Sequence, residues 1–198
     1  MNVLVAGATG KTGIRLVSEL TARGHHPIAL VRESSDTSVL PSHVELRQDD
    51  LTQLKDDVCD GCDAVVFAAG SGGSTGPEMT DKVDRDGAKR LVDLAAKAKV
   101  SRFVMLSSVG AGQPDPDSDM AHYLQAKHDA DEHLKASGIA YSILRPVALT
   151  EEDGTRAMRF GDEVDISASA ARGDVAAVLA DAVDDSLWEG TTMRMQSV

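Results

Sequence analysis

Short apolar runs alternate along the chain with longer segments in which apolar residues recur every three or four positions. The short runs are continuous rather than alternating, which is typical of strands that are buried on both faces of a sheet. Six strands are predicted on this basis, at residues 3–6, 28–32, 44–47, 64–69, 103–107 and 141–144. Two weaker strands are predicted at residues 164–166 and 192–196.

The longer segments predict helices at residues 12–22, 81–99, 120–137 and 174–183. Gly24 and Gly138 follow two of them, and glycine is common just past the end of a helix. Strands that alternate with helices are typical of a doubly wound α/β fold, the Rossmann fold, with a parallel sheet and helices on both faces. We expect a single domain of this kind over residues 1–198.

The charge of the chain limits its partners. Lys and Arg number 20 and Asp and Glu number 32, which gives a net charge of −12. Nucleic acids and anionic membranes attract basic surfaces, so we expect neither as a partner and favour a small-molecule substrate. The sequence is compatible with a homodimer. No signal sequence or membrane span is visible, and two cysteines do not make a disulfide framework, so we expect a cytoplasmic protein.

A glycine-rich turn, GATGKTG at residues 7–13, follows the first predicted strand. Gly7, Gly10 and Gly13 are spaced at intervals of three and precede the first helix. Residues without side chains allow backbone N–H groups to approach a pyrophosphate at the positive end of a helix. A phosphate-binding P-loop would need a glycine where Val5 stands, so the turn favours a dinucleotide.

This turn and several later segments resemble the short-chain dehydrogenase/reductase superfamily, in its atypical NAD(P)-binding branch of NmrA-like and flavin-reductase-like proteins. The later matches are Asp50-Leu51, Ala68-Ala69-Gly70, Ser107-Ser108, Tyr123 with Lys127, and Arg145-Pro146. They follow one another in the order of the superfamily across about three quarters of the chain. The extended epimerases of the superfamily carry a longer C-terminal substrate domain, for which this chain lacks the residues.

The resemblance implies a nicotinamide dinucleotide cofactor. The residues that it assigns to cofactor binding are Gly7, Thr9, Gly10, Lys11, Thr12, Gly13, Asp50, Leu51, Ala68, Ala69, Gly70, Lys127, Pro146 and Val147. Arg32 ends the second predicted strand, where a basic residue accepts the 2′-phosphate of NADP and an acidic residue binds the 2′-hydroxyl of NAD. Arg32, with Lys11 as a second charge, favours NADP, while Glu33 beside it keeps NAD open.

Tyr123 and Lys127 are four residues apart in a predicted helix, so their side chains share one face. A phenol exchanges protons poorly at neutral pH unless a nearby cation stabilises its anion. By the resemblance, Tyr123 is the catalytic acid, Lys127 supplies the charge and binds the ribose, and Ser107 or Ser108 orients the substrate oxygen. Asp84 stands where the superfamily usually has asparagine. This departure leaves open the alternative that Tyr123 has no catalytic role.

Together these features favour an NADP-dependent oxidoreductase that acts on a small carbonyl, quinone or flavin-like substrate. A non-catalytic redox sensor that binds the dinucleotide and a regulatory protein is the first alternative, and an NAD(P)-dependent sugar epimerase or dehydratase is the second. Cys59 and Cys62 form a C-x-x-C pair that we interpret as structural rather than redox-active. The histidines lack the spacing of a helical zinc site, so no metal is expected.

Overall fold

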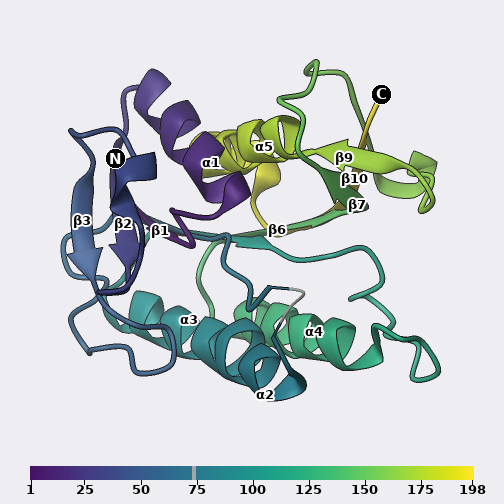
Figure 1. Cartoon of the computed structure of the whole chain (residues 1–198), viewed down its shortest axis with the longest axis horizontal. Helices are drawn as coiled ribbons and strands as arrows, with labels where there is room; N and C mark the ends of the chain where they lie inside the picture. Colours follow the sequence, from purple (N-terminus) through teal and green to yellow (C-terminus); the bar gives the residue numbers. More distant parts are fainter. Residues whose placement is uncertain (73–74) are drawn as a thin grey trace.

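A central sheet lies between two layers of helices in the computed structural model (Figure 1), which describes residues 1–72 and 75–198. The strand order is β3-β2-β1-β4-β5-β6-β10-β8, and only β8 runs antiparallel to its neighbour. The strands are β1 (Asn2–Ala6), β2 (His26–Val31), β3 (Glu45–Gln48), β4 (Ala64–Phe67), β5 (Arg102–Leu106), β6 (Tyr141–Pro146), β8 (Met158–Phe160) and β10 (Thr191–Ser197). A second, two-stranded sheet pairs β7 (Ala148–Thr150) with β9 (Ser169–Ala171). The predicted doubly wound fold is confirmed.

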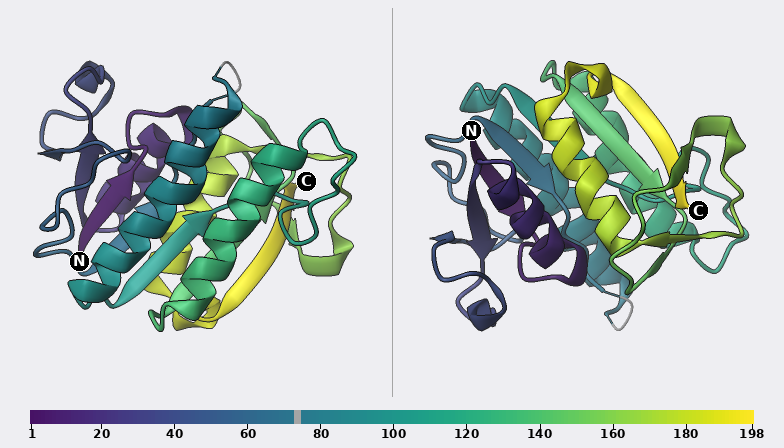
Figure 2. Two further views of the ribbon diagram at one scale, coloured as in Figure 1. Left: turned by 90° about the horizontal axis from the view of Figure 1, so that it is seen from below. Right: turned by 90° about the horizontal axis from the view of Figure 1, so that it is seen from above.

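The helices divide between the two faces of the sheet (Figure 2). One face is covered by α1 (Lys11–Ala22) and α5 (Arg172–Asp184). The other is covered by α2 (Pro77–Thr80), a π-helix (Asp81–Gly87), α3 (Ala88–Lys97) and α4 (Ala121–Ala136). Within the described residues, no helix is both long enough and apolar enough to cross a bilayer.

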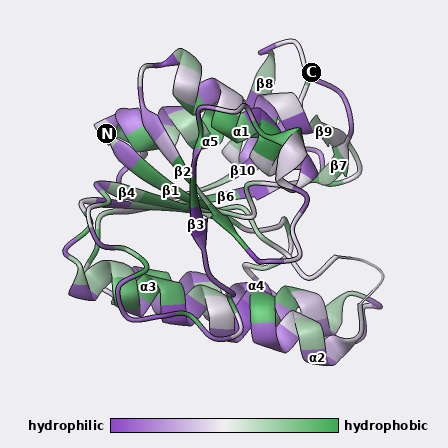
Figure 3. Cartoon of the chain, turned by 60° about the vertical axis from the view of Figure 1, so that its left-hand side comes forward, coloured by the Kyte–Doolittle hydropathy of each residue, from purple (hydrophilic) through white to green (hydrophobic). Residues whose placement is uncertain are grey.

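The strands supply two hydrophobic cores, one on each side of the sheet. Successive side chains of a strand point to opposite faces, so Val3 and Val5 of β1 enter the core under α1 and α5. Leu4 and Ala6 enter the core under α3 and α4. Figure 3 shows the apolar strands between helices whose outer surfaces are hydrophilic. Burial on both faces explains why these strands appear in the sequence as unbroken apolar runs.

The helix predicted at residues 81–99 begins earlier and contains an irregular turn. It starts at Pro77, which suits a first helical position because its missing N–H has no partner there. Residues 81–87 then adopt π-helical geometry, which is rare and frequent at functional sites. The π-helix brings Gly87 against the loop after β3, where a Cβ on residue 87 would lie 2.9 Å from the carbonyl oxygen of Leu51. The absence of a side chain permits this close approach.

The strand predicted at residues 164–166 is wrong. A 3-10 turn (Gly161–Glu163) precedes these residues, and the Asp165 carboxylate accepts hydrogen bonds from the backbone N–H and the hydroxyl of Ser167. Such a local side-chain turn competes with strand pairing. The apolar pair that suggested a strand is divided in the structure, because Val164 is buried and Ile166 is exposed.

Candidate functional site

The glycine turn after β1 has a geometry that only glycine permits. Gly7 has φ of +83°, and a Cβ there would lie 2.7 Å from the backbone of Ala69. A Cβ on Gly13 would lie 2.0 Å from the carbonyl oxygen of Gly7. The turn is closed by a 3.0 Å hydrogen bond from the Gly10 N–H to the Gly7 oxygen, and no side chain caps α1. The first N–H groups of α1 therefore fit a pyrophosphate ligand.

A cavity of about 650 Å³ opens beside this turn, at the carboxyl ends of β1, β2 and β4. This volume lies in the range of small-molecule and cofactor sites. The predicted residues that line it are Gly7, Thr9, Gly10, Arg32, Asp50, Leu51, Ala68, Ala69 and Gly70. Ser71, Thr75, Met79, Lys82 and Val83 also line it and were not predicted. The carboxyl ends of parallel strands are where open α/β sheets bind their ligands, so the cavity fits a dinucleotide.

At the outer end of the cavity, Arg32 is exposed and Asp50 lies nearby. The backbone N–H of Arg32 donates to the Ser35 hydroxyl at 3.1 Å, which closes the turn after β2. Oδ1 of Asp50 accepts hydrogen bonds from the backbone N–H and the hydroxyl of Thr52, both at 2.8 Å. These bonds and, to a smaller extent, the charge of Arg32 lower the pKa of Asp50 despite its partial burial. The rim thus presents a guanidinium beside a carboxylate that stays ionised.

Lys11 lies away from the cavity lining. Its ammonium forms a 2.8 Å ion pair with Glu151, which also lies 3.4 Å from Arg172. Arg172 in turn donates to the hydroxyl of Thr12 at 2.9 Å. These contacts hold the start of α1 against the segment after β7, so among the two predicted cations only Arg32 lines the cavity.

A buried ion pair lies behind the inner wall of the cavity. Nζ of Lys127 is 3.0 Å from Oδ1 of Asp84, and the two side chains are 3% and 0% exposed. The ammonium also donates to the carbonyl oxygens of Ala69 and Leu106, each at 3.4 Å. Asp84, carried by the π-helix, accepts a 2.9 Å hydrogen bond from the backbone N–H of Ser71. The pair therefore fixes two cavity-lining residues in place.

The environment of Lys127 keeps its amine charged. Burial alone would lower the pKa of Lys127, but the nearby Tyr123 phenol and the Asp84 carboxylate outweigh burial and raise it. Nζ lies 5.7 Å from the centre of the Tyr123 ring, one helical turn earlier in α4, and Tyr123 is partly exposed. The structure thus brings the predicted acid and the predicted cation together beside Ala69.

The two predicted serines differ in their hydrogen bonding. Ser107 is buried, and its hydroxyl donates to Oδ2 of Asp131 at 2.8 Å. The same oxygen accepts bonds from Nε and Nη2 of Arg145 at 3.0 and 2.8 Å. Burial raises the pKa of Asp131, although the Arg145 charge opposes the change. Ser108 is half-buried, and within residues 1–72 and 75–198 its hydroxyl makes one long bond of 3.4 Å, to the Val109 carbonyl, so this hydroxyl is the more available of the two.

Pro146 and Val147 lie at the end of β6 and are not among the residues that line the cavity within the described chain. The Pro146 carbonyl accepts from the Val109 N–H at 2.9 Å, and the Val147 N–H donates to the Met195 carbonyl at 3.1 Å. The sequence also carried an unused signal for Asp131, since it follows Lys127 by four residues on the same helix face.

The comparisons with known proteins identify the family to which the chain belongs. Residues 7–186 match the model of the NAD(P)H-binding family. The Bacillus subtilis protein named uncharacterized sugar epimerase YhfK is 40% identical over 161 residues, which cover 78% of this chain and 75% of that protein. A Bacillus halodurans structure, described as a candidate NAD-dependent epimerase/dehydratase, superposes with a TM-score of 0.94 at 38% identity and covers all of this chain and 94% of that one.

A third relative is the oxidoreductase ylbE from Lactococcus lactis. Its structure superposes with a TM-score of 0.87 at 30% identity, covering all of this chain and 91% of that one. The resemblance to atypical NAD(P)-binding Rossmann proteins, drawn from the glycine turn and the later motifs, is confirmed. The chain belongs to the NAD(P)H-binding family.

Proposed function

We propose that this chain is an NADPH-dependent oxidoreductase that reduces a small carbonyl, quinone or flavin-like acceptor. The observation that supports it most is the position of Tyr123 and Lys127. A charged, buried lysine contacts the cavity wall at Ala69, and a partly exposed tyrosine lies beside that lysine. Neither side chain lines the cavity within the described residues, but Lys127 reaches Ala69 of the wall, so the two supply a proton donor and a cation directly behind that wall.

When bound, a nicotinamide dinucleotide supplies a hydride to the acceptor. For a carbonyl acceptor, the Tyr123 hydroxyl donates the proton that the substrate oxygen then needs. The Lys127 ammonium favours the negative charge that develops on the tyrosine oxygen as the proton leaves. The Ser107 hydroxyl already donates to Asp131, so Ser108 is the serine that can donate to the substrate oxygen.

The choice of NADP over NAD rests on Arg32 at the rim of the cavity. Its guanidinium has the planar fork of donors that phosphate binding requires, and it lies where the 2′-phosphate of NADP is bound in Rossmann folds. Lys11 does not add to this charge, because it is paired with Glu151.

A second candidate function is a dinucleotide-binding sensor without turnover, and Asp84 favours it. Its carboxylate lies 3.0 Å from Lys127 and offsets the charge that Tyr123 would use. A third is suggested by the name of the YhfK relative, a sugar epimerase. The three functions differ in what happens to the cofactor: a reductase oxidises NADPH in proportion to product, an epimerase returns it unchanged, and a sensor only binds it.

The experiment is a binding titration with NADPH followed by NADPH-oxidation assays against quinones, flavins, aldehydes and ketones, with sugar nucleotides tested separately for isomerisation. We expect oxidation in proportion to product with at least one acceptor. Lys127→Met should lower this rate, whereas Lys135→Met, on the same helix but only partly buried and paired with Glu132, should not. Isomerisation without net oxidation would contradict the reductase, and tight binding without turnover would favour the sensor.

A further inference from the structure

A second hollow, of about 850 Å³, lies beyond β6 on the α4 side of the sheet. It is formed by the loop after β5, the turn after β8 and the strand β10. Figure 2 shows β10 lying beyond α4, so none of the described helices covers β10 on this face of the sheet. We call it the arginine groove, defined by Gly112, Arg145, Asp162, Thr192 and Arg194.

Two arginines lie side by side on the floor of this groove. Arg145 of β6 and Arg194 of β10 are partners in the strand register, so their side chains leave the same face of the sheet. Like charges directly opposite one another destabilise a sheet. Each guanidinium has one carboxylate partner, Asp131 for Arg145 and Asp162 for Arg194, so an anion in the groove must use the donors that these partners leave or give up.

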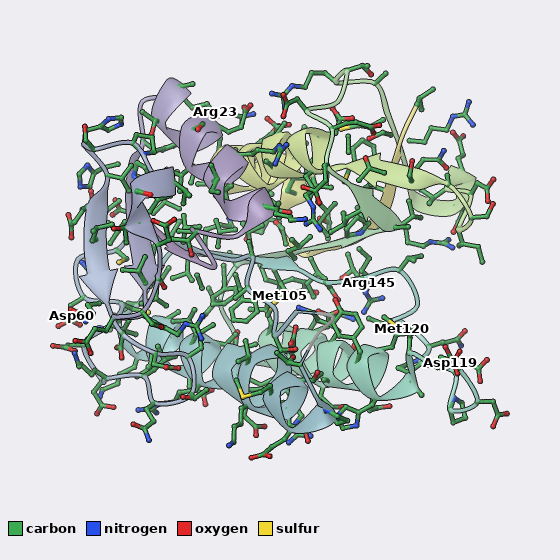
Figure 4. All side chains as sticks on the ribbon, viewed as in Figure 1. Arg23, Asp60, Met105, Asp119, Met120 and Arg145 are labelled. Carbon is green, nitrogen blue, oxygen red and sulfur yellow. The ribbon has the colours of Figure 1, made fainter. Side chains whose placement is uncertain are left out.

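Arg145 is held rigidly and keeps one donor group unused. Nε and Nη2 both bond to the fully buried Asp131, which leaves Nη1 without a hydrogen-bond partner within residues 1–72 and 75–198. Gly112 lies against this nitrogen, since a Cβ on residue 112 would come within 2.6 Å of it. Because residue 112 is glycine, no side chain from it covers Nη1, and the Arg145 side chain is 11% exposed in the groove. Figure 4 shows Arg145 between the sheet and α4, near the loop that begins α4.

Arg194 is held only loosely. Its guanidinium pairs with Asp162, whose side chain is fully exposed, while Arg194 itself is about two-fifths exposed. An exposed ion pair of this kind contributes little free energy and exchanges readily for another anion. Arg194 can therefore turn from Asp162 to a ligand that enters the groove.

The groove is joined to the proposed catalytic residues. Asp131 bonds both Arg145 and Ser107, and the loop that lines the groove directly follows Ser108. We infer that the arginine groove binds an oxyanion, a phosphate or a carboxylate, on a substrate whose reacting carbon is directed toward Ser108 and Tyr123. This inference rests on the proposed function for the identity of the reaction, but the anion site is testable without turnover.

Backbone-amide NMR with saturating NADP⁺ tests the inference, because the cofactor blocks phosphate binding at the glycine turn. The probes are phenyl phosphate, benzoate and the uncharged benzyl alcohol. We expect both anions to shift the amide signals of Gly112, Thr192 and Arg194, and the alcohol to leave them unchanged. The stronger of the two anions identifies the substrate as a phosphate or a carboxylate.

Three variants make the test specific. Arg194→Gln should weaken anion binding about tenfold, the effect expected from loss of a charged donor. Arg159→Gln, which removes an exposed arginine on the neighbouring strand β8, should leave binding unchanged. Asp162→Asn should strengthen binding, because it releases Arg194.

Equal binding of benzyl alcohol, or equal losses in Arg194→Gln and Arg159→Gln, would overturn the anion site. If the proposed function is wrong but the anion site is right, no acceptor will oxidise NADPH, yet the backbone-amide signals of the groove will still shift when the anions are added. If NADP⁺ itself fails to bind, the same titration is run without it, and the groove amides still report on the groove alone.

Discussion

Arg32→Ala should convert a chain that prefers NADPH into one that binds NADPH and NADH almost equally. Arg32 is exposed at the cavity rim and forms no ion pair within the described part of the chain. Its backbone N–H, not its side chain, makes the bond to Ser35 that shapes the turn after β2. The substitution therefore removes no internal contact that holds the fold, and stability should change by less than about 0.5 kcal/mol.

The size of the preference follows from the exposure of Arg32. Hydrogen bonds to a charged group contribute about 1.5–3 kcal/mol. The open rim and the ionised Asp50 nearby place Arg32 just below this range, near 1.4 kcal/mol, or about tenfold in affinity. NADH lacks the 2′-phosphate, so its affinity should not change.

The assay is a fluorescence titration with NADPH and with NADH at fixed ionic strength, since salt screens an exposed charge. Lys11→Ala is the matched control, because Lys11 is paired with Glu151 and should leave the NADPH preference intact. The reasoning is refuted if the unmutated chain binds both cofactors equally, if Arg32→Ala keeps the preference, or if Lys11→Ala removes it.

Three further predictions concern the turn, the buried lysine and the cysteines. Gly13→Ala should weaken NADPH binding more than tenfold and lower the midpoint of thermal unfolding, because the new Cβ would lie 2.0 Å from the Gly7 oxygen; an unchanged midpoint and affinity would contradict this. Lys127 has a raised pKa, so its stabilising effect is complete below the unfolded value of 10.5 and is lost as pH rises through the folded value. Urea unfolding should therefore show the same pH dependence in the unmutated chain and in Lys127→Met up to about pH 10, and a steeper loss of stability in the unmutated chain above about pH 10.5; parallel curves above that pH would refute it. Burial raises the pKa of Cys59 to about 12, so a thiol reagent at about pH 8 should label it over a thousandfold more slowly in the folded chain than after unfolding, and rapid labelling would refute its structural role.

Much of the sheet was predictable, because strands buried on both faces leave a strong local signal. The run at residues 64–69 marks β4 (Ala64–Phe67), and its last two residues continue past the strand into the cavity wall. Gly24 and Gly138 mark two helix ends, and both have positive φ. The strands β7, β8 and β9 were not predicted, because three residues are too few to show a period and their pairing depends on distant segments.

The backbone conformation of the candidate site could be predicted from the sequence, whereas the ion pairs around it could not. The glycine turn is a local pattern, and the structure confirms its shape. The pairing of Lys127 with Asp84 joins two helices that are far apart in the sequence, and it depends on the π-helix that turns Asp84 inward. The position of Lys11 depends on Glu151 in the same way. Sequence spacing identifies residues that are neighbours within one helix or strand. An ion pair between two elements depends on the tertiary fold, which the spacing does not show.

The central claim is that Tyr123 donates a proton in a reduction that uses NADPH. The most direct test compares the steady-state rate of NADPH oxidation in the unmutated chain, in Tyr123→Phe and in Tyr141→Phe. Tyr141 is the other tyrosine of the chain and lies at the amino end of β6, whereas the cavity lies at the carboxyl ends of the parallel strands. Tyr123→Phe should lower kcat about 10²-fold while the Kd for NADPH stays within about twofold, and Tyr141→Phe should change neither. A Tyr123→Phe variant that keeps its full rate would contradict the account.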